Sequence, residues 1–384
     1  MAALFLTNGA LFANLLPRYP EIKADLALSN AAYGMAVAAF SAGALLTGPS
    51  AAALIRRYRS SRVAVFGSAG IALFALLSAL APSAVTFAGA LFVAGAADAV
   101  TDVAQNAHAL RVQRRYGRSI FNSFHALWSA GAITGGAMGA AAIALGIPRG
   151  IHLTVSALLF TAVSLSAYRY LLPGSDAEDA DARSGAPRSP TGRIRLATYA
   201  ALAALVTIAI AGAVVEDAGA SWATLYVGQL GAPGAVAVMG YIAVVGLQFV
   251  GRLAGDRLVD RFGQRAVARA GGIVVAGGMG AALAFPSVPG VIAGFGAAGF
   301  GVATLIPAAM HGADELPGLR PGTGLTVVSW LLRVGFVLAP PLVGAVADLT
   351  DLRVGLLAVP AAGLVVVAAA GVLAGPQRRI PAQE

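Results

Sequence analysis

The sequence GRLAGDRLVDRFGQR, residues 251–265, carries four arginines and two aspartates. It begins inside one apolar segment, 233–256, and ends where another, 266–285, begins. A bilayer core about 30 Å thick needs roughly 20 apolar residues in a helix, and both segments are long enough. The charged stretch is therefore expected to join two membrane-spanning helices at one surface of a bilayer.

The rest of the chain repeats this alternation of apolar segments and short polar connections. Of its 384 residues, 58% are apolar and 11% are charged, whereas soluble domains carry about 25% charged residues. The composition predicts an all-α integral membrane protein with twelve transmembrane helices. The seventh segment is longer than a straight crossing needs, so we expect a break or a strong tilt in it. The expected ranges are 1–17, 31–55, 63–81, 84–110, 119–147, 150–171, 196–226, 233–256, 266–285, 288–310, 322–346 and 354–374.

One long hydrophilic stretch divides these segments into two equal sets. Residues 173–195 are rich in Pro, Gly, Ser, Arg and acidic residues, a composition typical of a flexible linker. We therefore expect an N-terminal six-helix bundle in 1–172, a cytoplasmic linker in 173–195 and a C-terminal six-helix bundle in 196–384. Two parallel repeats of this kind are a common transporter layout, with the substrate site between them.

The basic residues indicate the orientation of the helices. The chain carries 26 Lys and Arg against 17 Asp and Glu, and 21 of the 26 fall in alternate connections or at the C-terminus. Because Lys and Arg concentrate in cytoplasmic loops, both termini are expected to be cytoplasmic, in a bacterial inner membrane. The positive charge then faces anionic lipid, and nucleic acid is not needed to explain it.

The motifs of soluble enzymes are missing from the sequence. It has no Cys, no P-loop, no HExxH and no nucleophile elbow, so we expect no enzyme activity, no cofactor and no metal. Gly294, Gly296 and Gly299 have the spacing of a dinucleotide fingerprint but fall within an apolar segment. They therefore predict close helix packing, as does the tandem GxxxG pattern of Gly131, Gly135 and Gly139.

Residues 251–265 also carry a more specific pattern, in which glycines precede Asp-Arg and a Gly-x-Arg turn. It closely resembles the signature loop of the major facilitator superfamily, which implies a twelve-helix transporter that works by alternating access. In such a loop glycines let two helices approach, and Asp256 can pair with a nearby Arg and a helix end. The alternative is a solvated basic turn. The expected cytoplasmic gate residues are Gly251, Gly255, Asp256, Arg257, Arg261 and Arg265.

A second similarity is distributed over the fourth, fifth, seventh and eleventh segments. It resides in Asp102-Val-Ala-Gln-Asn106, Tyr116-Gly117-Arg118, Phe124-His125-Ala126, Trp128-Ser129-Ala130-Gly131, in Glu216, Trp222 and Tyr226, and in Arg333, Gly335, Pro340, Pro341, Gly344 and Asp348. These residues resemble the fucose-permease-like branch of the superfamily and its bacterial sugar-permease-like relatives. The resemblance implies a sugar-like substrate.

Acidic residues at membrane depth are the first candidates for proton coupling, because an unpaired charge there is costly. Asp98, Asp102 and Asn106 follow one another at one-turn intervals on one stripe of the fourth segment. His125 on the fifth segment is expected at the depth of Asp102. We hypothesise that Asp102 and His125 form a titrating pair, or that Asp98 alone takes up the proton. The alternative is that Asp102 and Asn106 only hold helices together.

Two further charged residues are expected near the substrate. Glu216, with Asp217 next to it, shares a segment with Trp222 and Tyr226, and a carboxylate beside aromatic faces suits hydroxylated or heteroaromatic solutes. The alternative is an aromatic anchor with solvated acids at the outer rim. Arg333 lies near mid-membrane, and its partner is expected to be Asp98, Glu216 or an anionic substrate, with an internal ion pair preferred. The expected cavity residues are Asn8, Asn14, Asn106, Asn122, Glu216, Trp222, Tyr226, Tyr241 and Arg333, with weaker candidates at Tyr33 and Gln248.

These observations favour a secondary active transporter that takes up a small polar, sugar-like solute together with protons and works as a monomer in the bilayer. A second hypothesis is proton-antiport efflux of a drug or metabolite. A third is a membrane receptor or scaffold that binds a ligand without transporting it. His152 and His311 are expected at the membrane interfaces and are given no role.

Overall fold

The computed structural model describes residues 1–117, 120–174, 196–319 and 323–373, without the side chains of 121 and 122. Every regular element in these ranges is a helix. Eleven of the described helical stretches are long and apolar enough to cross a membrane. A twelfth, α1 (Ala2–Ala13), is shorter and continues into η1 (Leu16–Arg18) and α2 (Tyr19–Asp25). The fold is therefore the all-helical membrane fold that the composition predicts.

The first half of the molecule contains α1 to α8. After α2 its elements are α3 (Asn30–Thr47), η2 (Gly48–Ser50), α4 (Ala51–Tyr58), α5 (Ser60–Ala79), α6 (Ala84–Tyr116), α7 (Phe121–Ala144) and α8 (Arg149–Tyr168).

The second half begins at α9. Its elements are α9 (Leu196–Gln229), α10 (Gly234–Ala237), α11 (Met239–Phe262), α12 (Gln264–Ala284), α13 (Val288–Val302), α14 (Leu305–Asp314), α15 (Thr323–Leu349), α16 (Leu352–Gly355), α17 (Ala358–Ala369) and η4 (Ala370–Val372). The predicted linker falls almost wholly in 175–195, outside the described residues.

The seventh predicted segment was expected to contain a break or to be strongly tilted, and the structure excludes the first of these alternatives. Helix α9 runs for 34 residues as a single α-helix, so the expected break is absent. It contains no proline, and its hydrogen-bond ladder can therefore continue. Interruptions occur elsewhere, where α3 gives way to η2 at Gly48 and Pro49 and where α13 gives way to α14.

Glycines fix the close packing inside each half. A Cβ on Gly131 of α7 would overlap the Leu6 carbonyl oxygen of α1, and one on Gly135 would overlap the Ala10 carbonyl oxygen. In the second half, a Cβ on Gly294 of α13 would lie 2.5 Å from Ala282, and one on Gly299 would overlap the Val244 carbonyl oxygen. Both glycine patterns therefore serve helix packing, as the sequence predicts.

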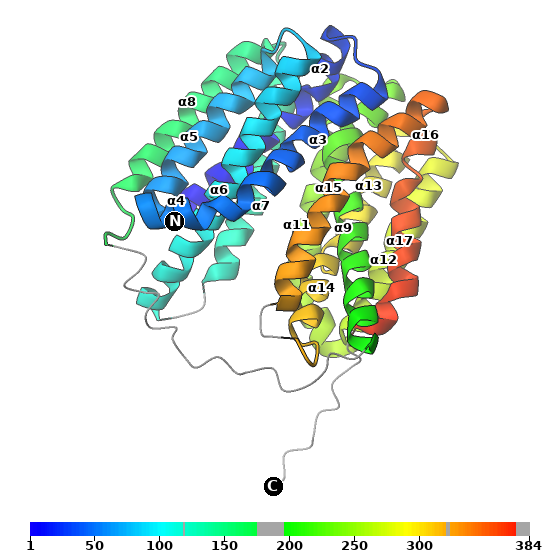
Figure 1. Cartoon of the computed structure of the whole chain (residues 1–384). Helices are drawn as coiled ribbons and strands as arrows, with labels where there is room; N and C mark the ends of the chain where they lie inside the picture. Colours follow the sequence, from blue (N-terminus) through cyan, green and yellow to red (C-terminus); the bar gives the residue numbers. More distant parts are fainter. Residues whose placement is uncertain (118–119, 175–195, 320–322, 374–384) are drawn as a thin grey trace.

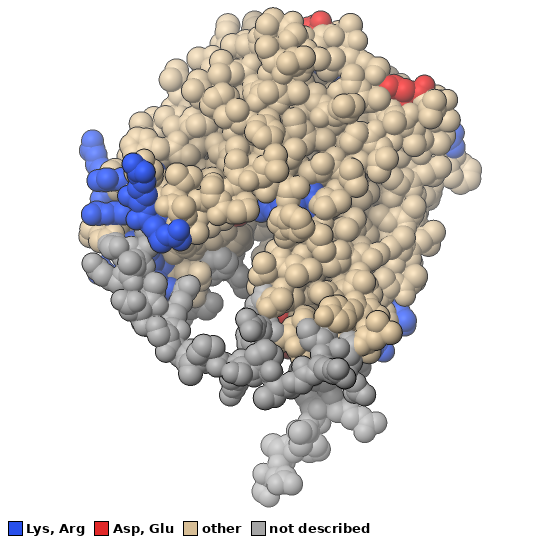
Figure 2. Space-filling model, viewed as in Figure 1, with Lys and Arg blue, Asp and Glu red and all other residues tan. Residues whose placement is uncertain are grey.

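The two halves lie side by side and meet most closely at one end (Figure 1). We call this the closed end; α2 and α16 lie there. At the other end, here the linker end, α8 finishes and α9 begins, and the two halves part. Figure 2 shows the same face unbroken above and hollowed below, with basic side chains gathered beside α4.

The contacts that hold the halves together at the closed end include a polar one and a packing one. Asp348 of α15 accepts hydrogen bonds from the backbone N–H groups of Asn30 and Ala31 at the start of α3, both at 2.8 Å. A carboxylate suits this position, because the first N–H groups of a helix lack partners and carry partial positive charge. The second contact joins α7 to α11, where a Cβ on Gly136 would lie 2.9 Å from the Tyr241 ring.

Candidate functional site

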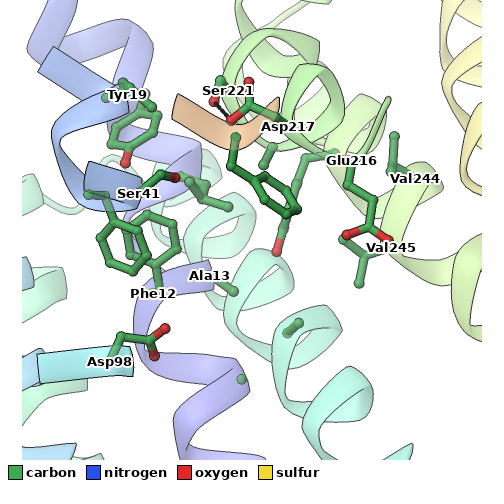
Figure 3. A pocket seen from close by; sticks show the side chains of 18 of the residues that line it. Phe12, Ala13, Tyr19, Ser41, Asp98, Glu216, Asp217, Ser221, Val244 and Val245 are labelled. Carbon is green, nitrogen blue, oxygen red and sulfur yellow. Dashed lines mark hydrogen bonds between the residues drawn. The ribbon is translucent and has the colours of Figure 1, made fainter. Parts of the chain in front are cut away.

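A cavity of about 280 Å³ lies between the two halves near the middle of the molecule. Figure 3 shows acidic side chains on both sides of it, with Asp98 on the first half and Glu216 and Asp217 on the second. Elements α1, η1, α2, α3, α6 and α7 supply one wall, and α9, α11 and α15 supply the other. The lining residues that carry polar groups are Asn8, Tyr19, Ser41, Asp98, Trp128, Glu216, Asp217, Ser221, Tyr241 and Gln248.

A wider chamber of about 800 Å³ continues the cavity toward the linker end. We call it the vestibule. The start of α7, the end of α11 and helix α14 line it, and Glu216 and Phe336 line both spaces. A solute can therefore approach the cavity from the linker end.

Aromatic rings block the opposite direction. The Tyr33 ring lies edge-on to Trp222 with centroids 5.0 Å apart, and Tyr19 lies edge-on to Tyr33 at 5.8 Å. The Tyr33 hydroxyl donates to the Ser221 carbonyl oxygen across the two halves at 2.7 Å. Together with the Asp348 contact, these rings close the cavity toward α2 and α16.

Asp98 belongs to a hydrogen-bonded chain across three helices. The Trp128 indole N–H donates to Asn8 Oδ1 at 2.8 Å, and Asn8 Nδ2 donates to Asp98 Oδ1 at 3.1 Å. All three side chains line the cavity. The predicted cavity residue Asn8 thus holds the predicted proton carrier Asp98 in place.

Asp102 lies one turn from Asp98 on α6, and the charges of the two groups interact. Asn106 Nδ2 donates to Asp102 at 3.1 Å, and the charge of Asp102 also interacts with His125 of α7. His125 lines the vestibule and stacks edge-on against Phe5 at 5.3 Å. Asp102 and His125 therefore lie close enough for their charges to interact.

Glu216 is bound on the second half by two residues of α11. Gln248 donates a short hydrogen bond to its Oε1, and an Arg252 guanidinium nitrogen lies 3.4 Å from the same oxygen. Arg252 lines the vestibule and Gln248 the cavity. Glu216 therefore sits at the junction of the two spaces.

Arg333 of α15 was predicted to line the cavity, but it lines neither the cavity nor the vestibule. Its charge interacts with Asp98 and with Asp102 of α6. Within the described ranges it makes no direct ion pair with either acid. The expected internal ion pair is therefore not formed among the described residues, although the Arg333 charge still acts on both acids of the first half.

The structure corrects several of the predicted cavity residues. Trp222 is fully buried against Tyr33, and Tyr226 is 4% exposed; neither lines the cavity, because their face of α9 packs into the closed end. Asn14 is also fully buried and accepts from His152 at 2.9 Å and from Ser156 at 3.2 Å on α8. Asn106 bonds Asp102 but lines neither space, and the side chain of Asn122 lies outside the described residues.

His152 also differs from its interfacial expectation. It is 7% exposed, and Arg18, itself 5% exposed, donates to its Nδ1 at 3.4 Å. This buried network joins α1, η1 and α8 within the first half. The sequence did not predict this network, because Arg18 and His152 are 134 residues apart in the chain.

The predicted gate residues lie at the end of α11 and the start of α12. Gly251 packs against Ala303, where a Cβ would lie 2.6 Å away, and Gly255 and Asp256 line the vestibule. Asp256 makes no ion pair or hydrogen bond with any residue that the structure describes. The predicted latch is therefore not formed with the vestibule open. The basic members are exposed at the linker end: Arg257, Arg261 over the Phe262 ring, and Arg265 donating to the Leu373 carbonyl oxygen.

Five polar lining residues were not predicted as site residues, namely Tyr19, Ser41, Trp128, Asp217 and Ser221. Asp217 follows Glu216 directly, so it occupies a different face of the helix and points toward the closed end. Ser221 Oγ donates to Asp217 Oδ1 at 3.3 Å. The i, i+4 spacing of an acid and a serine in an apolar segment is the one sequence signal that could have found this pair.

A two-halved helical membrane fold with a central cavity open toward one end defines a carrier-type membrane protein. The Major Facilitator Superfamily profile matches residues 1–259, and the chain belongs to this family of transporters. It is therefore a membrane transporter and not an enzyme.

Individual relatives agree with this assignment. The chain is 31% identical over 375 residues to the membrane protein MosC of Rhizobium meliloti, covering 95% of this chain and 87% of that one. Among solved structures, the nucleoside transporter NupG aligns with a TM-score of 0.76 at 12% identity over 96% of each chain. A D-xylose-proton symporter aligns with a TM-score of 0.70 at 15% identity, over 96% of this chain and 94% of that one. The two structures share the fold.

Proposed function

We propose that the protein is a secondary active transporter that moves a small polar solute across the bacterial cytoplasmic membrane by alternating access. The observation that carries the proposal is the cavity between the halves, which is closed toward α2 and α16 and continuous with the vestibule at the linker end. A transporter needs a site that one opening reaches at a time.

The linker end faces the cytoplasm in this proposal. The basic connections cluster there, and Lys and Arg concentrate in cytoplasmic loops. Both termini are then cytoplasmic, the conformation is inward-facing, and one chain supplies the whole cavity and can act as a monomer. Accessibility of single cysteines to an impermeant thiol reagent in whole cells tests this orientation. Tyr116→Cys should react only after permeabilisation, and labelling of intact cells would reverse the orientation.

The solute is proposed to be a small hydroxylated ring, with sugar-like compounds as the first class to test. Rings in the cavity wall offer flat faces, including Phe12 and Phe40 stacked at 4.2 Å. Carboxylates and amides beside them can accept or donate hydrogen bonds to hydroxyl groups. The names of the two similar structures, a nucleoside transporter and a xylose symporter, support the same class.

Proton coupling is proposed to use Asp98, Asp102 and His125. The two acids lie one turn apart in the first half, Asp98 lines the cavity, and the charge of Arg333 in the second half interacts with both acids. Protonation of either acid would weaken that attraction across the halves. Uptake of a proton and a solute from the outer side would then favour the same rearrangement.

Counterflow and gradient-driven uptake in proteoliposomes test this proposal. Purified protein is first screened by thermal shift against sugars, nucleosides and vitamins, and a hit is then measured for transport. Asp98→Asn and Asp102→Asn should retain counterflow and lose accumulation driven by an inward proton gradient. Glu315→Gln, an exposed acid at the linker end, is the matched control and should retain both.

The same assay distinguishes the other hypotheses. Proton-antiport efflux would give solute loss from vesicles when protons move in the opposite direction, together with resistance on expression in cells. A receptor or scaffold would bind the hit without any counterflow. Intact gradient-driven accumulation in both Asp variants would contradict the proposed coupling residues.

A further inference from the structure

The closed end of the cavity carries two buried polar atoms that have no hydrogen-bond partner within the part of the chain that the structure describes. They are Oδ2 of Asp217, a residue 7% exposed, and the hydroxyl of Tyr19, a residue 1% exposed. Both residues line the cavity, Tyr19 from the first half and Asp217 from the second. Figure 3 shows both on the side of the pocket away from Asp98, with Tyr19 on one wall and Asp217 beside Ser221 on another. Buried polar atoms are usually satisfied, so this pair points to a ligand group.

Asp217 also differs from the other buried acids in its charge environment. Glu216 has Arg252 at 3.4 Å, and the charges of Asp98 and Asp102 interact with Arg333. Among the described residues Asp217 has only the Ser221 hydroxyl, which donates to Oδ1, and no ion pair. A buried carboxylate without a countercharge is costly, and a cationic ligand group would remove that cost.

We infer that Asp217, Tyr19 and Ser221 form a subsite for a protonated amine of the solute. The inference rests on the proposed transport function and specifies its substrate class as a small hydroxylated ring bearing one amine. An ammonium group has three N–H donors, and the subsite offers three acceptor oxygens: Asp217 Oδ2, the Tyr19 hydroxyl and Ser221 Oγ. A neutral hydroxyl could satisfy the hydrogen bonds, but it would leave the carboxylate charge uncompensated.

The remaining cavity wall fits the rest of such a molecule. The stacked rings of Phe12 and Phe40 cover an apolar ring face, while Asp98 and Glu216 at the other end can accept from hydroxyl groups. Those two acids already have partners in the protein. The amine is therefore directed to Asp217, and its position fixes the orientation of the solute.

The absence of cysteine from the sequence makes a direct test possible. Ser221→Cys places a single thiol in the subsite, and its reaction rate is measured with methanethiosulfonate reagents that differ in charge. Each rate is divided by the rate of the same reagent with a free thiol in solution. We expect the trimethylammonium-ethyl reagent to react at least 10-fold faster than the sulfonatoethyl reagent. Introducing Asp217→Asn should reduce this ratio to near one.

Two controls separate a local effect from a general one. Ser41→Cys places a thiol on the α3 wall of the same cavity, and Asp217→Asn should change its ratio much less. Asp217→Ser is a second neutral variant, for use if the Asn variant does not fold. A ratio near one in Ser221→Cys, a ratio that survives removal of the carboxylate, or no reaction even with the neutral methyl reagent would each overturn the inference.

A ligand comparison extends the test to the transporter itself. Matched pairs that differ only by amine or hydroxyl, beginning with glucosamine and glucose, are compared by thermal shift and counterflow in wild-type protein and Asp217→Asn. We expect the amine to be preferred by wild type and the preference to be lost in the variant. Counterflow of neutral rings with equal activity in both proteins would overturn the amine subsite and leave the transport proposal intact. If the methanethiosulfonate reagents show the expected charge selectivity but no solute gives counterflow, the transport proposal is overturned and the cation-selective subsite remains.

Discussion

Glycine allows close helix packing in two different regions of this molecule, inside one half and between the two halves. Inside the first half, Gly131 of α7 lets the Leu6 carbonyl of α1 approach, whereas between the halves Gly344 of α15 admits the Asn30 carbonyl of α3. In both places a Cβ would overlap a carbonyl oxygen. The first contact must persist throughout transport, and in the proposed cycle the second must open. Glycine contacts can thus be structural or conformational, depending on which bodies they join.

The largest expected effect comes from the contact inside a half. Gly131→Val should destabilise the protein by at least about 1–3 kcal/mol, because neither backbone can move away without separating α1 from α7. The measurement is the thermal unfolding midpoint of purified protein and its yield in the folded peak. Gly89→Val is the matched control, since its Cβ meets nothing within 4 Å. Equal stability of the two variants would contradict the rigid contact.

The contact between the halves should respond differently. Gly344→Val should leave a folded protein that opens at the closed end, because the overlap can be relieved by moving one half. Spin labels on exposed Met35 and Leu349 should report a longer distance by electron paramagnetic resonance. A pair on Tyr116 and Phe262 at the linker end should report a shorter one. Loss of the folded state would mean that this contact is structural as well.

The hydrogen bonds of Asp348 should give a smaller shift in the same direction. Asp348→Asn removes the charge and one of two acceptors at the start of α3, worth about 0.5–2 kcal/mol as a helix cap. The population of the inward-facing state should fall several-fold, measured with the same labels. Lys23, whose charge also interacts with Asp348, provides a comparison: Lys23→Gln should have a weaker effect. A larger effect of Lys23→Gln would place the main attraction in that charge pair.

The smallest effect on this conformation is expected at the cytoplasmic gate. Asp256→Asn should not change the stability of the inward-facing state, because Asp256 has no partner among the described residues. It should lower the outward-facing population only if the latch forms when the vestibule closes. This expectation is tested with the two spin-label pairs described above, in a protein that carries both Gly344→Val and Asp256→Asn and in one that carries Gly344→Val alone. If Asp256→Asn leaves the outward-facing population unchanged, Asp256 does not form the predicted contact when the vestibule closes.

The sequence predicted the relative placement of some candidate residues, because that placement depends on local geometry. Asp98 and Asp102 share a stripe by helical periodicity alone, and His125 shares their depth by counting residues from the charged connection. Trp222 and Tyr226 were misplaced because the rotation of α9 about its axis decides whether they face the cavity. In a membrane helix almost every face is apolar, so hydrophobic periodicity gives little information on that rotation.

The amino-acid sequence by itself determined the number of spans, their approximate limits and the fold class, since bilayer thickness fixes helix length and charges are excluded from hydrocarbon. Only the tertiary structure decided which end of the cavity is closed and that Asp217 is buried with no countercharge among the described residues. These properties depend on side chains from helices far apart in sequence, as Tyr33 and Ser221 illustrate across 188 residues. Their distances are set by the packing of whole halves, which no local pattern encodes.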